Sequence, residues 1–142
     1  MRALIWHVDS FVSRITEKGR SSVVEPMGER ETRVAEAILV LASVEKADER
    51  APQIVAQRAA AMLVEHARKL KVNTVVLHSF AHLFAELAAP QVAIDVLKET
   101  EARLAEAGLI VVRTPFGYFN ELEIKAKGHP LSRLARVFSV EE

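Results

Sequence analysis

The sequence of 142 residues contains no cysteine. It therefore has no disulfide framework, no thiol nucleophile and no cysteine-based zinc site. This fits a reducing compartment, so we expect a cytoplasmic protein. It also has no excess of either charge, because 19 basic residues balance 19 acidic ones. Since binding of phosphates needs clustered positive charge, such a domain is a poor candidate for holding nucleic acid on its own.

Long apolar runs are missing too. No stretch of about 18 apolar residues occurs, so no membrane-spanning helix is expected. The apolar segment at residues 1–7 is too short for a signal peptide. Neither a Walker-type glycine loop nor the G-x-S-x-G elbow of serine hydrolases is present. The chain is half apolar by count, which is enough for a real core, and we expect residues 1–142 to form a single domain.

The spacing of apolar residues predicts strands alternating with two long helices. Strands are expected over 3–8 and, after a turn at Asp9-Ser10, over 11–16 as the second half of a hairpin, before an exposed loop at 17–31. One helix begins at Pro52 and runs through Lys71, and the other begins at Pro90 and is capped by Gly108. Further strands are expected over 36–44, 74–77, 109–112 and 121–127, and a short helix or turn over 131–138.

This order of elements predicts the fold class. Two strand–helix–strand units indicate parallel strands joined by right-handed crossovers. The N-terminal hairpin and the last strand would add antiparallel partners. We therefore expect an α/β fold, at the border with α+β, in which helices pack on a mixed β-sheet.

The stretch from Val75 to Leu83 is the first candidate site. A buried strand stops at a polar elbow, after which helical spacing resumes, and the carboxyl edge of such a sheet is where ligands bind. His82 lies on the elbow and is a candidate catalytic residue, whereas His78 is expected to be a packed or surface histidine. On a continuous helix His78, His82 and Glu86 could bind a metal, but the strand that runs into His78 removes that geometry and we expect no metal. Ser79 beside His82 lacks a group to orient it as a hydrolase pair.

Two further groups of residues are candidates. The turn Phe116-Gly117-Tyr118-Phe119 could be a wall for a flat ring or simply core, and Gly117 favours a turn where the backbone approaches a ligand. A local basic end either contacts phosphate or is solvated surface; it contains Lys125, Lys127, His129, Arg133 and Arg136.

Four segments resemble the N-terminal editing domain of archaeal threonyl-tRNA synthetases, in the family's order and across essentially the whole chain. They are Ser43-Val44-Glu45-Lys46, Phe80-Ala81-His82-Leu83 with Glu86-Leu87-Ala88 and Pro90, Pro115-Phe116-Gly117-Tyr118, and Lys127-Gly128-His129-Pro130-Leu131. That family is similar in fold to D-aminoacyl-tRNA deacylase.

The resemblance implies hydrolysis of serine wrongly esterified to threonine tRNA, with the threonyl ester spared. It implies that water is activated with help from the free hydroxyl of the terminal ribose, without metal or cofactor. It also implies three partners, namely the 3′ end of tRNA(Thr), other domains or subunits of the synthetase, and a second copy in a homodimer.

The resemblance also places the site residues. His82 and Asn120 are the expected catalytic residues, and substrate binding is expected from Val44, Glu45, Phe80, Ala81, Phe116, Gly117, Tyr118, Phe119, Lys127, His129 and Arg133. Two positions depart from the family's pattern, since Asn120 stands where lysine is common and Arg133 where glutamate is common. Asn120 can hydrogen-bond a water but carries no charge, which favours backbone and RNA groups as the catalysts.

Two other functions stay open at this stage. One is a deacylase that acts on D-aminoacyl-tRNA. The other is a regulatory module that binds an amino acid or nucleotide without turnover.

Overall fold

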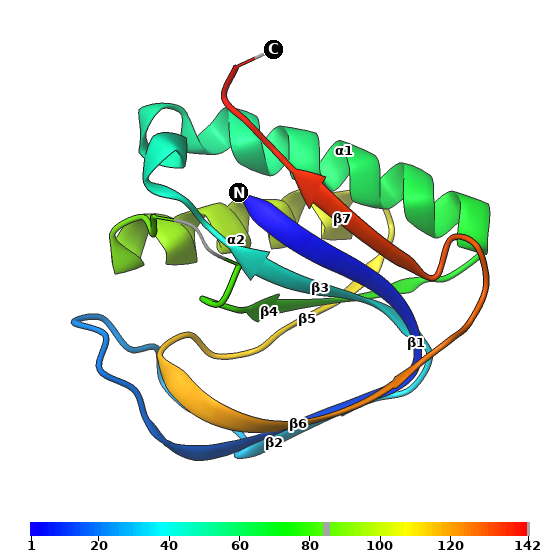
Figure 1. Cartoon of the computed structure of the whole chain (residues 1–142), viewed down its shortest axis with the longest axis horizontal. Coiled ribbons are helices and arrows are strands. Elements are labelled where there is room, and N and C mark those ends of the chain that lie inside the picture. The colour runs from blue at the N-terminus through cyan, green and yellow to red at the C-terminus, as the bar shows by residue number, and fades with distance from the viewer. Residues whose placement is uncertain (84–85, 142) are drawn as a thin grey trace.

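The computed structural model describes residues 1–83 and 86–141. These residues form one mixed sheet and two long helices (Figure 1). In chain order the elements are β1 (Arg2–Lys18), β2 (Glu31–Val34), β3 (Ala37–Ser43), the 3₁₀ turn η1 (Lys46–Arg50), α1 (Pro52–Leu70), β4 (Thr74–Ser79), α2 (Pro90–Glu106), β5 (Ile110–Arg113), β6 (Tyr118–Ala126) and β7 (Arg133–Val137). Among them, neither helix is long and apolar enough to cross a membrane.

The sheet confirms the predicted class. Its strand order is β2-β1-β3-β4-β5, with β6 and β7 also paired to β1. The β3–β4 and β4–β5 pairs are parallel, whereas every pairing of β1 is antiparallel. The fold is therefore α/β, with parallel strands next to the helices and an antiparallel extension built around β1.

The predicted N-terminal hairpin is wrong, because residues 2–18 form the single strand β1. Its first part pairs with β3 and β7 and its second part with β2 and β6. Asp9-Ser10 lacks the glycine or asparagine that a tight hairpin turn needs. A shift in register against β6 between Val8 and Ser10 takes up the extra residue as a bulge, and bulges bend a strand. The sheet consequently curls, with β6 and β2 forming its lower part in Figure 1.

Three other predictions differ from the structure. Residues 133–137 form the strand β7 rather than a helix or turn, because they pair with the start of β1. Residues 31–34, at the end of the predicted loop and just beyond it, form β2. Strand β6 begins at Tyr118 rather than Glu121, so part of the aromatic turn belongs to it.

Both helices agree with the sequence. Each begins with proline, whose missing N–H would be unpaired in the first turn. Gly108 follows α2 with a φ of 94°, which fits a helix C-terminal position. The helices share one core with the face of the sheet that carries Ile38 and Val40.

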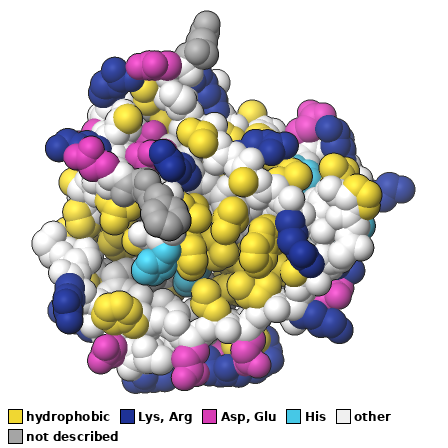
Figure 2. All heavy atoms as spheres, in the orientation of Figure 1, with side chains coloured by type: hydrophobic (Ala, Val, Ile, Leu, Met, Phe, Trp, Pro, Cys, Tyr) yellow, Lys and Arg dark blue, Asp and Glu magenta, His cyan; other side chains and the backbone are white. Residues whose placement is uncertain are grey.

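The opposite face of the sheet has its own core. Leu39, Leu41 and Val76 pack there with Phe11, and β6 adds Leu122 and Ile124. In Figure 2 apolar side chains gather across the middle of the visible face, between the helices and β6, while most charged side chains lie around its edge. The curl of β1 thus encloses a second apolar layer, and the candidate site lies beside it.

Candidate functional site

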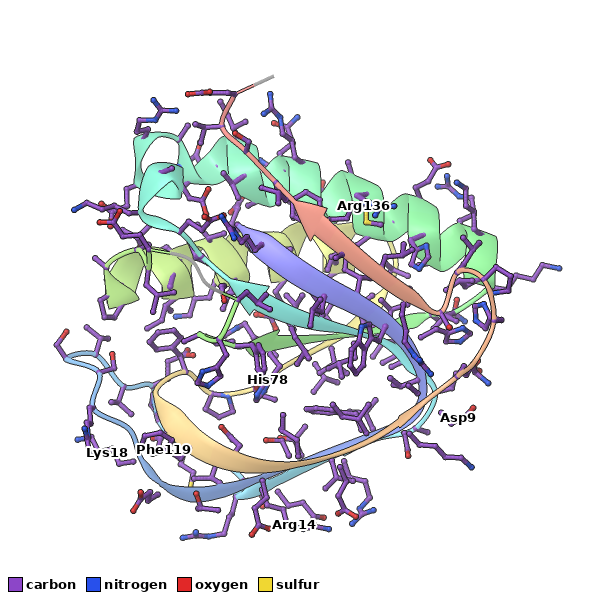
Figure 3. The ribbon with its side chains drawn as sticks, viewed as in Figure 1. Asp9, Arg14, Lys18, His78, Phe119 and Arg136 are labelled. Carbon is purple, nitrogen blue, oxygen red and sulfur yellow. The ribbon has the colours of Figure 1, made fainter. Side chains whose placement is uncertain are left out.

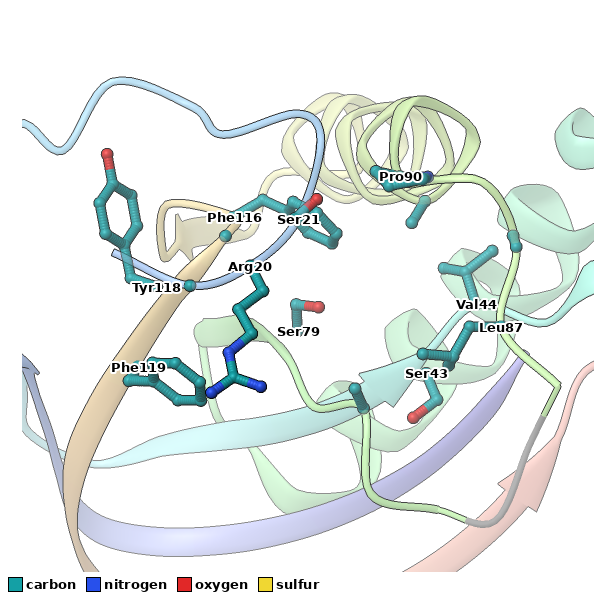
Figure 4. A pocket seen from close by; sticks show the side chains of 15 residues that line it. Arg20, Ser21, Ser43, Val44, Ser79, Leu87, Pro90, Phe116, Tyr118 and Phe119 are labelled. Carbon is teal, nitrogen blue, oxygen red and sulfur yellow. The ribbon is translucent and has the colours of Figure 1, made fainter. Parts of the chain in front are cut away.

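A cavity of about 340 Å³ lies where β3 and β4 end (Figure 4). This edge of a parallel sheet is where α/β folds bind ligands, and the size is in the range of small-molecule sites. The walls come from the ends of these two strands, the start of α2, the loop after β1 and the turn into β6. The lining residues are Gly19, Arg20, Ser21, Ser43, Val44, Ser79, Ala81, Leu87, Ala88, Pro90, Ala93, Phe116, Gly117, Tyr118 and Phe119.

The elbow after β4 forms the floor through its backbone. The amide of Phe80 donates to the carbonyl of Ala42 at 2.8 Å, and the hydroxyl of Ser43 donates to the carbonyl of Phe80. These bonds continue the β3–β4 pairing past the end of β4. Ala81 follows directly and lines the cavity. The two hydrogen bonds of Phe80 therefore hold the backbone that leads directly into Ala81.

The expectation that helical structure resumes after His82 is wrong for the described residues. Helix α2 begins only at Pro90. Before it, the amide of Ala88 donates to the carbonyl of Val44 at 3.0 Å, and the amide of Lys46 donates to the carbonyl of Glu86 at 2.8 Å. An extended backbone satisfied in this way has no need of a helix. Val44, Leu87 and Ala88 consequently form one wall of the cavity.

Two glycines allow the opposite wall to form. The amide of Gly19 donates to the carbonyl of Gly117 at 2.8 Å. A Cβ on Gly19 would lie 2.8 Å from that same oxygen, which is closer than real Cβ atoms approach. Gly117 has a φ of 102°, and a Cβ there would meet Val24 at 3.0 Å. The loop after β1 and the turn into β6 can therefore meet only with glycine at both positions.

An ion pair holds the same loop against the turn. The guanidinium of Arg113 bonds both carboxylate oxygens of Glu25, at 2.5 and 3.0 Å, and the amide of Phe116 donates to Glu25 at 3.0 Å. Burial opposes ionisation of Glu25, but Arg113 and the Phe116 amide outweigh it, so the pKa of this carboxyl is below its ordinary value. The pair is mostly buried and bidentate, which is the strong form of this interaction.

The side chains at the cavity differ in direction (Figure 4). The ring of Tyr118 turns away, and its hydroxyl donates to the carbonyl of Glu25 at 2.5 Å. The hydroxyl of Ser79 faces the open centre, and the guanidinium of Arg20 points toward the ring of Phe119. Arg20 is the one charged side chain among the described lining residues. The cavity therefore combines an apolar interior with a few hydroxyl groups and a single positive charge.

The two histidines of the elbow lie in different environments. His78 is 5% exposed, its Nδ1 lies 2.7 Å from the Thr114 hydroxyl, and its ring packs edge-on against Phe11. Burial lowers the pKa of His78 to about 4. His82 is exposed, and its ring stands edge-on to Phe80 at a centroid distance of 5.0 Å. The sequence leaves His78 either packed or on the surface, and the structure shows it packed, on strand β4. The described residues around His82 are not helical, so the helical spacing that a shared metal would need is not formed.

Several predicted site residues lie outside the cavity lining. His82 and Phe80 adjoin it through Ala81, whereas Asn120 donates from its Nδ2 to the hydroxyl of Ser13 at 3.0 Å. The carboxylate of Glu45 lies 3.3 Å from Arg2 and 3.5 Å from the N-terminal ammonium. Val44, Ala81 and the turn Phe116–Phe119 do line the cavity. The structure thus brings together the predicted residues that contribute backbone or apolar surface.

Most of the basic end lies away from the cavity, since Figure 3 places Asp9, which Lys127 contacts, on the side of the molecule opposite Phe119. Arg136 is the exception, because it pairs with Ala3, and Ala3 pairs with Ala42 beside the cavity residue Ser43. Strand β6 spans the nine residues Tyr118–Ala126, so at about 3.3 Å per residue its two ends lie up to roughly 26 Å apart. Lys127 lies 2.5 Å from Asp9, the ring nitrogens of His129 and His7 lie 2.8 Å apart, and Arg133 donates to the carbonyl of Lys127 at 3.3 Å. A phosphate contact by these residues would be separate from the cavity.

The loop after β1 supplies site residues that the sequence alone does not indicate. Gly19, Arg20 and Ser21 belong to a segment expected only as an exposed loop. At Ser79 the sequence suggests only a nucleophile that no neighbouring group orients. No periodicity marks these residues, and their position depends on contacts with a turn about 100 residues later in the chain.

Both a family model and individual relatives match this chain over nearly its whole length. Residues 1–138 match the model of the family described as the archaea-specific editing domain of threonyl-tRNA synthetase. The chain is 39% identical to threonine–tRNA ligase of Thermococcus gammatolerans, over 100% of this chain and 23% of that protein. It is 38% identical to the threonine–tRNA ligase of Methanopyrus kandleri, over 99% of this chain and 22% of that protein. It is also 38% identical to the threonine–tRNA ligase of Pyrococcus furiosus, over 100% of this chain and 23% of that protein. The chain thus spans less than a quarter of the length of these relatives.

The buried His78 predicts how stability depends on pH. Because its pKa falls from an ordinary 6.5 to about 4 on folding, the unfolded chain binds more protons between these values. Above pH 6.5 His78 is neutral in both states and does not change the free energy of unfolding with pH. As the pH falls from 6.5 toward 4, it lowers the free energy of unfolding by about 1.4 kcal/mol per pH unit. Urea unfolding of the wild type and of His78→Gln at pH 7, 6 and 5 measures it. The wild type should lose stability more steeply than the variant; equal slopes would contradict the account.

Proposed function

Because this chain belongs to the family of archaea-specific editing domains of threonyl-tRNA synthetase, we propose that it hydrolyses serine wrongly esterified to tRNA(Thr) and spares the threonyl ester. The observation that carries this proposal is the cavity at the ends of β3 and β4. It is small and apolar, and backbone segments held by hydrogen bonds form much of its wall. These are the properties that a size filter for an amino-acid side chain requires.

A size filter is needed because binding alone separates these amino acids poorly. Serine lacks one methyl group of threonine, and a synthetic site that accepts threonine can reject serine by only about 1–3 kcal/mol. A second site gains selectivity if the extra methyl group clashes with its walls. Main-chain walls suit this task, since they cannot yield by changing a rotamer. Ala81 and Gly117 are both among the residues that line the cavity.

In the proposed reaction the substrate supplies part of the catalysis. A water molecule adds to the ester carbonyl, the bond from carbon to the ribose oxygen breaks, and a proton passes to that oxygen. The free hydroxyl of the terminal ribose orients the water. This role suits the cavity, because no imidazole or carboxylate side chain is among its described lining residues and such a side chain would be the usual general base.

His82 has a supporting place in this scheme. Its exposed ring follows Ala81 directly and stacks edge-on against Phe80. We propose that it contacts the ribose at the mouth of the cavity. The Asn120 amide, which is bonded to Ser13, then contributes little to the chemistry.

The partners follow from the neutral charge of the chain. A domain without net positive charge holds RNA weakly, so other domains or subunits of the synthetase share the capture of tRNA(Thr). The chain acts as one editing domain and forms a homodimer. Its relatives are about four times longer, which leaves room for those other domains.

The direct test offers three esters to the purified protein. Seryl-tRNA(Thr), threonyl-tRNA(Thr) and a D-aminoacyl-tRNA are incubated separately, and loss of the ester is followed against the rate without protein. Selective loss of serine is expected. Preferential loss of the D-amino acid would replace the proposal with D-aminoacyl-tRNA deacylation, and loss of none would favour a module that binds without turnover.

Enlarging the floor of the cavity should impair the reaction. Ala81→Val adds two methyl groups at a position that lines the cavity, and when substrate fills the cavity the added bulk should cost about 1–3 kcal/mol, as overpacking does in a filled core. The rate of seryl-tRNA hydrolysis should fall at least fivefold. Ala135→Val, at an exposed position of β7 outside the cavity, is the control and should retain the rate. Undiminished hydrolysis by Ala81→Val would mean that the elbow is not the pocket.

Removing the Asn120 amide should have a small effect. If Asn120 only holds Ser13, Asn120→Ala should lower the deacylation rate less than tenfold, by loss of one neutral hydrogen bond of about 1 kcal/mol. Ser13→Ala removes the partner of the same bond and should act similarly. A loss above a hundredfold in Asn120→Ala alone would show that the amide takes part in the chemistry.

A further inference from the structure

Arg20 lines the cavity without a carboxylate partner. Within the described residues no acidic side chain lies within ion-pair distance of it. Six other arginines pair with glutamates, namely Arg2, Arg14, Arg33, Arg50, Arg103 and Arg113. Arg30, Arg58, Arg133 and Arg136 have no carboxylate partner there either, but each donates to a backbone carbonyl. Glu25, which lies in the same loop after β1, has its carboxylate paired with Arg113. The positive charge of Arg20 is therefore available to a ligand.

Arg20 also lies at the mouth of the cavity, where the part of a bound ligand nearest to solvent would lie. It is an exposed residue that nevertheless lines the cavity, and its guanidinium points toward the ring of Phe119, which is itself 50% exposed (Figure 4). The aliphatic part of an arginine can lie on apolar surface while its charged end stays in water. Arg20 thus presents its charge at the mouth, while the interior of the cavity remains uncharged.

The chemistry of the proposed substrate identifies the group that Arg20 would bind. The carboxyl group of the amino acid is consumed in the ester, and its amino group is positive. The sugar and base are neutral. The nearest negative charge is the phosphodiester on the 5′ side of the terminal nucleotide, and guanidinium forms paired hydrogen bonds with phosphate oxygens.

We propose that Arg20 binds the phosphodiester that precedes the terminal nucleotide and thereby positions the ester in the cavity. This inference rests on the proposed function and adds a residue for capture of the RNA end. Arg20 is a positioning residue, since it contacts the substrate away from the reacting carbonyl. The contact also gives a nearly neutral domain one local means of holding RNA.

The test compares two stable ligands that differ in one charge. Both carry serine joined to 3′-amino-3′-deoxyadenosine through an amide that is not hydrolysed, and one also carries a 5′ methyl phosphodiester. Binding is measured by calorimetry. The wild type should bind the ligand that carries the phosphodiester about tenfold more tightly than the ligand without it. This is the factor that one exposed charge-assisted hydrogen bond supplies. In Arg20→Ala this gain should fall below twofold, and Arg20→Lys should keep part of it.

Lys18→Ala is the matched control. It removes the same charge two residues away, at an exposed position of β1 that does not line the cavity. It should keep the tenfold gain. A second measurement is the salt dependence: the slope of log K against log salt for the phosphodiester should fall by about 0.7 in Arg20→Ala, the value for one phosphate of a single strand.

Each outcome decides a different claim. Equal affinity of the wild type for both ligands, or an equal loss in Lys18→Ala and Arg20→Ala, would overturn the role of Arg20 and leave the proposed function standing. Failure of the wild type to bind either ligand would overturn the proposed function, and this inference with it. Circular dichroism of Arg20→Ala excludes unfolding as the cause of a loss.

Discussion

The cavity depends on a close approach between two backbone segments that are about 100 residues apart in the chain. The amide of Gly19 reaches the carbonyl of Gly117, and neither position has room for a side chain. The ion pair between Glu25 and Arg113 holds the same segments together from a second direction. Without this approach the loop after β1 would not cover the ends of β3 and β4, and the site would be an open edge of the sheet.

The curl of β1 brings these segments within reach. One strand of 17 residues pairs with β3 and β7 near its start and with β2 and β6 near its end. The bulge at Asp9 bends it between the two parts. The end of β1 and the start of β6 therefore lie together beside the carboxyl ends of the parallel strands. A single long strand thus joins the scaffold of the fold to the wall of the site.

The parts of this fold that the sequence could predict are those with local signals. Pro52, Pro90 and Gly108 mark the helix ends, and the apolar run of β3 marks a buried strand. The polar pair Asp9-Ser10 in β1 suggests the turn of a hairpin, whereas the choice between a turn and a bulge depends on whether β6 lies alongside. The sequence does not indicate β7 for the same reason, since its five residues are a strand only through pairing with β1.

The residues of the site also differ in whether a local signal in the sequence indicates them. The elbow at Ala81 follows a predicted strand and the turn at Phe116 holds aromatic residues around a glycine, whereas only the family resemblance indicates Val44. Nothing in the sequence indicates Arg20 and Ser21, because a loop gives no sign of which distant turn it will meet. If the cavity lined by Ala81 and Gly117 receives the aminoacyl end of a tRNA, a crystal structure with the amide-linked seryl-adenosine analogue will show the ligand there. We predict that the seryl group lies against Ala81 inside this cavity; ligand bound instead beside Lys127 and His129, with the cavity empty, would contradict the account.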